Sequence, residues 1–335
     1  MKLRTTLGCL LAVTALTAGC GSGARPAAAG KSLDKVTLTL NWYPYGEHAP
    51  LYYGVKHGVF AKYGIDLTIQ AGKGSGPTIQ AVGGGKSDFG WADTPALMQA
   101  VGKGVPVRSL GVYLQNTPAS VQFFTSEGIT SPAALKGRRI AGTAGDALSK
   151  TFPIFLAHNG LAPSDVAIQN TDAAGKLAAV ISGQVDALLG NANDQGPTIQ
   201  GKTGKPMTEM RFSQFGLDYY GDGLIASDRE LAKADLAKRM VQAVSESWAD
   251  AAADPAAAVA AMAGVNPQTP PAAVLSQELA TTLTLLHTSS TAGKPPGADT
   301  EADWQATVDT ITKAGLVPSA QPVSAYWDES VALKG

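Results

Sequence analysis

The sequence contains very little cysteine. Among its 335 residues there are two cysteines, Cys9 and Cys20, and both lie within the first 20 positions. The rest of the chain can therefore form neither a disulfide nor a thiolate metal site. A fold of this length must be stabilised by core packing, and a hydrophobic content of 44% is enough to build such a core.

The sequence also lacks an excess of charge of either sign. Its 26 basic and 27 acidic residues give a net charge of −1. This balance excludes the basic surface that nucleic acids require, and it excludes a polybasic patch for acidic lipids. We therefore expect no nucleic-acid partner and no direct electrostatic binding to a membrane.

Long hydrophobic runs are confined to the beginning of the chain. Lys2 and Arg4 precede an apolar run from Leu7 to Leu16. The run has the length of a signal-peptide core and is too short to span a bilayer. No other stretch approaches 18 consecutive apolar residues, so we expect no second anchor.

The residues after this run resemble a bacterial lipobox. Small residues come directly before Cys20, although Thr17 stands where leucine is usual. The alternative is an ordinary secretory cleavage with an incidental cysteine, but the Gly-, Ser- and Ala-rich residues that follow are typical of a flexible tether. We expect a signal peptide over 1–19, lipid attachment at Cys20 and a tether over 20–32. The protein would then be anchored to the extracytoplasmic face of the cell membrane.

Strand-like and helix-like patterns alternate from Val36 onward, in two rounds. The first round predicts strands at 36–40, 65–69, 88–91 and 105–114, and helices over 50–63, from 77, and from 94 with Thr94 as N-cap. The second round predicts strands at 120–125, 139–141, 166–168 and 185–189, and helices at 147–158 and 174–182. Such repetition is typical of mostly parallel sheets covered by helices.

The two rounds predict an α/β protein with two lobes. Lobe I would contain residues 33–117 and 223–335, and lobe II residues 118–222. The segments 115–119 and 212–222 would connect them. The last third is helical, and its apolar residues at helical spacing, among them Trp248, are expected to cover lobe I as core.

The most unusual stretch lies between the first strand and the first helix. Residues 41–52 read Asn-Trp-Tyr-Pro-Tyr-Gly-Glu-His-Ala-Pro-Leu-Tyr. In open α/β sheets, ligands bind beyond the carboxyl ends of the strands, and exposed aromatic residues usually cover something flat or a second lobe. We therefore expect Trp42, Tyr43 and Glu47 to contact a ligand. The alternatives are that the aromatic rings only cover the end of the sheet and that Glu47 is a solvated loop charge.

This stretch resembles the start of a known family, the solute-binding proteins related to thiamine-pyrimidine-precursor, nitrate, sulfonate and taurine binders. The resemblance is carried by Asn41-Trp42, the run 48–52, and the segments 58–67, 88–93, 135–141 and 183–188, and it covers most of residues 36–226. It implies a type II periplasmic-binding-protein fold whose two lobes close on a small molecule. It also implies a partner ABC permease, and we expect a monomer without a cofactor.

Within this family, the sequence looks most like the thiamine-pyrimidine-precursor branch. A yeast relative in that branch is a single-turnover enzyme that makes the pyrimidine from its own histidine and bound pyridoxal phosphate, and His48 matches the place of that histidine. The same enzyme has a cysteine-rich motif for iron, whereas this chain has no cysteine after residue 20. We therefore expect that the protein is not an enzyme and that His48 is a pocket or helix-start residue.

Further candidates follow other predicted strands or lie at the return crossing: Trp91, Asp93, Thr143, Asn191, Asn193, Tyr219 and Asp222. Each has a structural alternative, such as helix capping for Asp93, an Asx turn for the asparagines or hinge packing for Tyr219. The glycine-rich run 72–78 lacks the end of a P-loop, so it predicts a loop that leads into a helix, with Ser75 or Thr78 as a candidate ligand contact.

The candidate residues are aromatic, acidic and amide-bearing, and no arginine is obvious among them. A strong anion would favour arginine, so we expect a flat heterocycle that is neutral or weakly cationic, such as an aminopyrimidine. The alternatives are a flavin-like or sulfonated molecule, an enzyme of pyrimidine synthesis, and a cell-surface interaction protein. We also expect Trp42→Ala and Trp91→Ala to weaken binding, and Trp248→Ala to destabilise the core.

Overall fold

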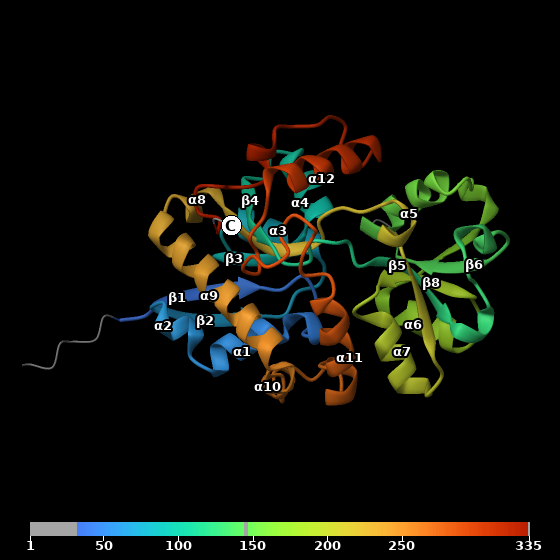
Figure 1. The fold of residues 1–335 in the computed structure, drawn as a ribbon, viewed down its shortest axis with the longest axis horizontal. Helices are drawn as coiled ribbons and strands as arrows, with labels where there is room; N and C mark the ends of the chain where they lie inside the picture. The colour runs from blue at the N-terminus through green and yellow to red at the C-terminus, as the bar shows by residue number, and fades with distance from the viewer. Residues whose placement is uncertain (1–31, 144–146, 334–335) are drawn as a thin grey trace, which may run out of the picture. The chain divides into compact units, whose positions relative to one another are not determined.

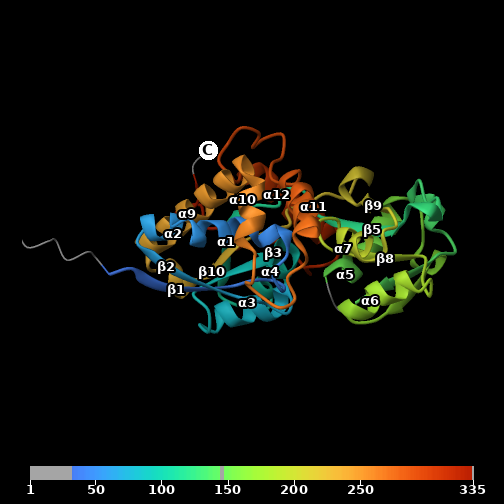
Figure 2. The same cartoon turned by 90° about the horizontal axis from the view of Figure 1, so that it is seen from below.

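The computed structural model describes residues 32–143 and 147–333 and contains two five-stranded sheets (Figures 1 and 2). The first sheet has the order β2-β1-β3-β10-β4 and is built from β1 (Asp34–Thr39), β2 (Ile65–Gln70), β3 (Phe89–Asp93), β4 (Val107–Val112) and β10 (Asp222–Ser227). The second has the order β7-β6-β8-β5-β9 and is built from β5 (Ala119–Phe124), β6 (Arg139–Gly142), β7 (Ala167–Asn170), β8 (Ala187–Asn191) and β9 (Met207–Arg211). The expected α/β fold with two lobes is confirmed. The expected signal peptide, Cys20 and most of the tether lie outside the described residues.

Helices cover both sheets (Figure 1). Around the first sheet these are α1 (Ala49–Lys56), α2 (Val59–Lys62), α3 (Ser75–Gly83), α4 (Thr94–Val101), α8 (Asp228–Leu231), α9 (Ala234–Ala253), α10 (Pro255–Ala261), α11 (Ala272–Leu283) and α12 (Glu301–Lys313). Around the second they are α5 (Ala147–His158), α6 (Ala173–Ile181) and α7 (Gln195–Thr203). Among the residues that the structure describes, none of the helices is both long and apolar enough to cross a bilayer.

Two local predictions were wrong. The single helix expected over 50–63 is broken, because Gly58 adopts a positive φ of 76° between α1 and α2. The N-cap of α4 is Asp93 rather than Thr94, and the Asp93 carboxylate accepts from the Ala96 backbone N–H at 3.0 Å. The Thr94 hydroxyl instead donates to the carbonyl of Gly221 at 2.7 Å, which ties the start of α4 to the return crossing.

The return crossing ends in β10, a strand that the sequence did not predict. β10 lies antiparallel between β3 and β4, with Leu224 opposite both Trp91 and Gly111. Every residue of this strand is buried. The strand begins at Asp222, so this residue belongs to the first sheet although the proposed boundary at 222/223 assigns it to lobe II.

The core of the first sheet contains an aromatic stack. Trp91 and Trp248 lie nearly parallel, with ring centroids 5.6 Å apart and an interplanar angle of 9°, and Tyr113 packs against both. Both indoles are 0% exposed. The expected contrast between Trp91 in an open cleft and Trp248 in the core is therefore wrong, because both rings belong to one core.

The two crossing segments are bonded to each other and to the C-terminal part of the chain. The Gly221 N–H donates to the Leu114 carbonyl at 2.7 Å, and the Leu114 N–H donates to the Asp222 carbonyl at 3.0 Å. Just after α11, the carbonyl of Leu285 accepts from the backbone N–H of Gln115 at 2.8 Å. Backbone hydrogen bonds thus hold the first crossing to the second and to the segment after α11.

Candidate ligand-binding site

The loop after β1 brings its side chains against α11. A 3₁₀ turn at Gly46–His48 leads into α1. A Cβ at Gly46 would lie 2.4 Å from the Cβ of Glu278 and 2.6 Å from the backbone nitrogen of Leu279, so only glycine allows this approach. The Gly46 N–H donates to the Glu278 carboxylate at 2.8 Å. The loop and helix α11 therefore meet at a buried acid.

Glu47 lies at the centre of the site and is 0% exposed. Its carboxylate accepts from the Trp91 indole N–H at 2.6 Å, from the Asn193 amide at 2.9 Å and from the Tyr45 hydroxyl. Burial raises the pKa of Glu47, and these donors partly oppose the shift. The alternative of a solvated loop charge is therefore wrong.

Asn193, which follows β8 of the second sheet, bonds to residues around the first sheet. Besides Glu47, its amide donates to the Thr282 hydroxyl of α11 at 2.9 Å. In the same region the Thr198 hydroxyl of α7 donates to Glu278 at 3.2 Å. Residues that follow β8 thus bond directly to residues around the first sheet, and the loop at 41–48 meets the Asn193 loop.

Asp194 is a buried acid that the sequence reasoning did not select. It is 4% exposed, and its Oδ2 accepts from the Gln195 amide. Burial raises its pKa to about 7, although the charge of Lys176 lowers the pKa and that of Glu47 raises it. Burial and the charge of Asp194 also raise the pKa of Glu278 to about 9. Burial is the larger cause of both shifts, and the charge of the neighbouring acid adds to each.

His48 is buried behind this cluster, with both ring nitrogens occupied. Its Nε2 lies 2.9 Å from the Asn41 Oδ1, and the Asn41 amide donates to Asp222 at 2.9 Å. The hydrogen therefore belongs on Nε2, while Nδ1 accepts from the Tyr45 backbone N–H at 3.4 Å. Burial lowers the pKa of His48 to about 3, so the ring is neutral. The expectation that His48 contacts a ligand directly is therefore not supported, because the ring is buried and both of its nitrogens are bonded within the fold.

Trp42 and Tyr43 are the half-buried aromatic residues of the loop. Their ring centroids lie 5.4 Å apart at an angle of 46°. Burial and the charge of Asp194 raise the pKa of Tyr43, which places the Tyr43 ring beside the acids. Unlike Trp91, these two rings retain some exposure next to the cluster.

The remaining expected site residues have structural roles and make no described hydrogen bond to Glu47, Asp194 or Glu278. Asp93 caps α4, Thr143 accepts at its carbonyl from Ser149, the Asn191 N–H donates to Gln195, and Tyr219 lies buried in the crossing. Ser75 and Thr78 also serve the fold: Ser75 accepts from the Asp93 N–H, and Thr78 donates to the Leu40 carbonyl.

Sequence reasoning missed several residues of this cluster: Asn41, Tyr45, Lys176, Asp194, Glu278 and Thr282. Glu278 had a detectable signal, because an acid between Leu275 and Leu279 interrupts the apolar stripe of a helix. Asp194 stood inside the expected loop but resembled an ordinary turn residue.

The arginines near the expected strands are engaged elsewhere. Arg108 pairs with Asp228 and Asp328, and Arg139 pairs with Asp186. Arg211 was not considered from the sequence. It lies at the end of β9, its guanidinium reaches the hydroxyl of Thr284 at 3.4 Å, and its buried Nε has no partner among the described residues.

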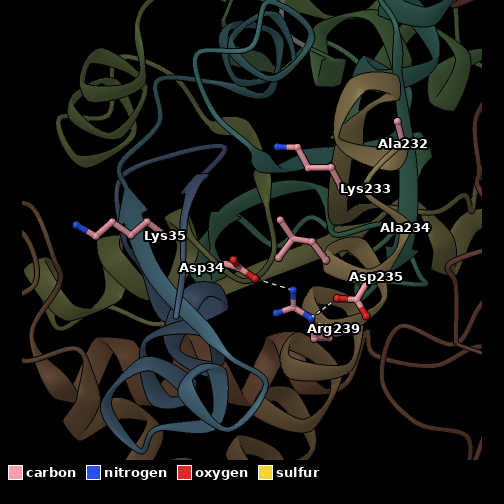
Figure 3. Close-up of a pocket in the computed structure, with 8 residues that line it drawn as sticks. Asp34, Lys35, Ala232, Lys233, Ala234, Asp235 and Arg239 are labelled. Carbon is pink, nitrogen blue, oxygen red and sulfur yellow. Dashed lines mark hydrogen bonds and ion pairs between the residues drawn. The ribbon is translucent and has the colours of Figure 1, made fainter. Parts of the chain in front are cut away.

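Two cavities lie away from this cluster. Figure 3 shows one of about 550 Å³, where Arg239 bonds to Asp34 and Asp235. Asp34 begins β1 whereas Asn41 follows its end, so this cavity lies at the opposite end of the strand from the site. The other, of about 280 Å³, is mostly apolar and lies between α5 and β7. In the described part of the chain, no group of three or more His, Cys, Asp and Glu side chains is arranged to hold a metal.

Comparisons with known proteins place this fold among binding proteins and thiamine-related proteins. A family model described as NMT1/THI5 like matches residues 46–258. A 4-amino-5-hydroxymethyl-2-methylpyrimidine phosphate synthase of Saccharomyces cerevisiae is 28% identical over 185 residues, 54% of each chain, so the match spans about half of that relative. A Haemophilus influenzae protein whose name refers to thiamine biosynthesis is 23% identical over 302 residues, 88% of this chain and 91% of that one.

A solved structure extends the likeness to nearly the whole chain. The periplasmic aliphatic sulphonate binding protein SsuA of Escherichia coli superposes with a TM-score of 0.69 at 16% identity. The match covers 91% of this chain and 95% of that one. At this identity the likeness shows the periplasmic-binding-protein fold and leaves the ligand to be argued from the site.

Proposed function

Because the chain belongs to the NMT1/THI5-like family, we propose that it is the extracytoplasmic solute-binding component of an ABC importer. In this proposal it captures a small flat heterocycle, such as a thiamine pyrimidine precursor, between its two lobes. The ligand is released unchanged to a membrane permease. The protein is a monomer, and the lipid on Cys20 keeps it at the membrane.

The observation that carries the proposal is the buried acid cluster where the two sheets' loops meet. Glu47 and Glu278 come from elements around the first sheet, and Asp194 comes from the second. Trp42 and Tyr43 provide half-buried rings beside them. Carboxylates accept N–H donors, and aromatic faces stack on flat rings, so an aminopyrimidine satisfies both groups of residues.

The state of His48 supports binding rather than synthesis. A histidine that is consumed as a substrate must expose its ring to the reaction. Here the ring is 0% exposed, and both nitrogens are hydrogen-bonded within the fold. The His48–Asn41–Asp222 chain instead holds the loop onto β10, which is a positioning role for the aromatic and acidic side chains of the site.

A second candidate is a binder of sulfonated or other anionic aromatic molecules, and Arg211 is the observation that favours it. Its buried Nε has no partner among the described residues, and guanidinium groups bind sulfonates and phosphates well. The adjacent Glu209 lies 3.7 Å from this guanidinium and offsets its charge. The cluster of acids favours the aminopyrimidine over this alternative.

A thermal-shift panel tests the proposal. Purified protein is melted with 4-amino-5-hydroxymethyl-2-methylpyrimidine, a flavin, a purine and an aliphatic sulfonate. We expect the aminopyrimidine to raise the melting temperature most, because a ligand that binds only the folded state stabilises it. A shift with the sulfonate alone would favour the second candidate. No shift with any member would contradict solute capture and favour a cell-surface interaction protein.

A further inference from the structure

The acid cluster places three buried carboxyl groups near one lysine. Glu47, Asp194 and Glu278 are 0%, 4% and 0% exposed, and burial raises the pKa of each carboxyl group. Lys176 is the cation whose charge lowers the pKa of Asp194, and its ammonium also donates to the Leu189 carbonyl at 3.0 Å. With pKa values raised to about 7 and about 9, Asp194 and Glu278 hold protons readily near neutral pH, and a bound cation would favour the charged form of Asp194.

The hydrogen bonds identify which acid lacks donors. Glu47 accepts from three donors, and Glu278 accepts from a backbone N–H and a hydroxyl. Asp194 accepts from the Gln195 amide at Oδ2 alone, and its buried Oδ1 has no partner among the described residues. A buried acceptor without a donor costs about 1–3 kcal/mol, and more when it is charged.

A second acceptor of the same kind lies on the neighbouring residue. The Asn193 amide nitrogen donates to Glu47 and Thr282, so the orientation of the amide is fixed by these two acceptors. Its Oδ1 is then buried, again without a partner in the described part of the chain. Two adjacent residues therefore each have a buried oxygen that can accept a hydrogen bond, and neither oxygen receives one from the described residues.

We propose that Asn193 and Asp194 select the ligand of this site, and that they select a cation with two adjacent N–H donors. An amidinium group has this chemistry. A 4-aminopyrimidine has it when it is protonated on N3, the ring nitrogen beside the amino group. This inference rests on the proposed function. It adds the charge of the bound ligand and the two residues that recognise that charge. One N–H of such a cation would donate a charge-assisted hydrogen bond to the Asp194 Oδ1, and the other would donate to the Asn193 Oδ1.

The same pair rejects close analogues. A pyrimidinone replaces the exocyclic amine by a carbonyl, so only its ring N–H can donate, and the carbonyl lone pairs would face the other oxygen and leave it unpaired. Loss of a donor at a site built to accept it is penalised more strongly than loss of apolar contact. An anion would add negative charge to a cluster whose carboxyl groups already repel one another.

Flat probes of fixed charge test this selection. Benzamidine is cationic, benzamide is its neutral isostere and benzoate is anionic. Titration of the wild-type protein should give benzamidine an affinity at least about tenfold above benzamide, with benzoate weaker still. Asp194→Asn should reduce the benzamidine preference to about twofold or less, because it removes the charge and retains the shape. The 4-amino and 4-oxo forms of 5-hydroxymethyl-2-methylpyrimidine should follow the same order.

Asp186→Asn is the matched control. Asp186 lies just before the other end of β8 and is paired with Arg139, so its loss should leave the ligand preference unchanged. Melting curves establish that each variant is folded, and Asp194→Ser replaces Asp194→Asn if the latter is not. An unchanged benzamidine preference in the Asp194 variant would overturn the proposal, as would equal wild-type affinity for all three probes.

The two proposals fail in different ways. A flavin, purine or sulfonate that binds tightly, with no preference for benzamidine over benzamide, overturns the selection of a cation and leaves solute capture standing. No binding by any probe or pyrimidine overturns both.

Discussion

Trp91 and Trp248 stack on each other in the core, so their truncation should have the same kind of effect. Trp91→Ala and Trp248→Ala should each lower the free energy of unfolding by about 3–5 kcal/mol, as large-to-small core changes do. Trp42→Ala should lower stability less and weaken ligand affinity by about 1–3 kcal/mol, by analogy with base stacking. Denaturant melts and ligand titrations on the three variants check this. A Trp91→Ala variant with an unchanged melt would place that ring outside the core.

The titratable groups of the site predict a stability maximum in mildly acidic solution. His48 has an ordinary pKa of 6.5 and a folded pKa of about 3, so the unfolded chain gains a proton first, and the contribution of His48 to stability is lost as the pH drops from about 6.5 towards 3. Asp194 and Glu278 have folded pKa values of about 7 and about 9, against ordinary values of 3.8 and 4.5. Their contributions are fully present below about pH 4 and are lost as the pH rises through the folded values.

Denaturant melts from pH 3.5 to pH 9 test this dependence. His48→Gln should remove the His48 contribution, which changes by up to about 4 kcal/mol between pH 6.5 and pH 3.5 at about 1.4 kcal/mol per pH unit. Glu278→Gln should flatten the alkaline limb. Stability that rises steadily from pH 5 to pH 8 in the wild type would contradict the burial of these groups.

The sequence identified residues that carry unusual chemistry in a loop, and it missed those that resemble their neighbours. Glu47 and Asn193 were selected because they follow strands, and they contact each other at 2.9 Å. Trp91 was wrongly expected in the cleft, because the sequence around a tryptophan at a strand end does not distinguish a side chain in a cleft from one in the core. Asp194 and Glu278 were missed because their burial depends on the approach of segments far apart in the chain.

At the scale of elements, α1 and α9 approach closely at Gly54. A Cβ there would lie 2.0 Å from the Ser247 hydroxyl and 2.8 Å from the Ser247 Cβ. Gly54→Ala should therefore destabilise the protein by about 1–3 kcal/mol through overpacking. Gly76→Ala in α3 is the control: a Cβ at Gly76 would have no neighbour within 4 Å, and the lower entropy of the unfolded chain should stabilise the protein by about 0.4–1 kcal/mol.

Thermal melts of both glycine variants decide between packing and helix propensity. If both changes stabilise, α1 and α9 are not in close contact at this point. The sequence could not reveal this contact, because Gly54 alone reads only as a weak position in a helix.

Helices and strands whose apolar residues recur at a regular spacing were predicted well, and those without such a spacing were not. β1, β2 and α5 lie within a residue or two of the expected ranges. β10 was missed because all of its residues are buried and the run is short, so it shows no alternation. α7 was missed because glycine, proline and polar residues dominate it, and it is positioned by contacts with α11 and β9.

At the scale of the whole molecule, the two-lobe fold followed from the repeated strand–helix rhythm, because each round must bury its own sheet. Attachment to a membrane is proposed through the lipid on Cys20. Cys20→Ser should move the protein from the membrane fraction to the soluble fraction and leave its melting temperature unchanged. Fractionation of cells that express each form measures this. A folded Cys20→Ser protein that stays with the membranes would count against the lipobox.

The central claim is that this molecule binds a flat, donor-bearing heterocycle and does not transform it. Isothermal titration of the purified protein with 4-amino-5-hydroxymethyl-2-methylpyrimidine tests the claim most directly. We predict a saturable signal with one ligand bound per chain and a return to baseline after each injection. A titration without binding heat at several temperatures, or a heat flow that continues after saturation as in turnover, would contradict the account.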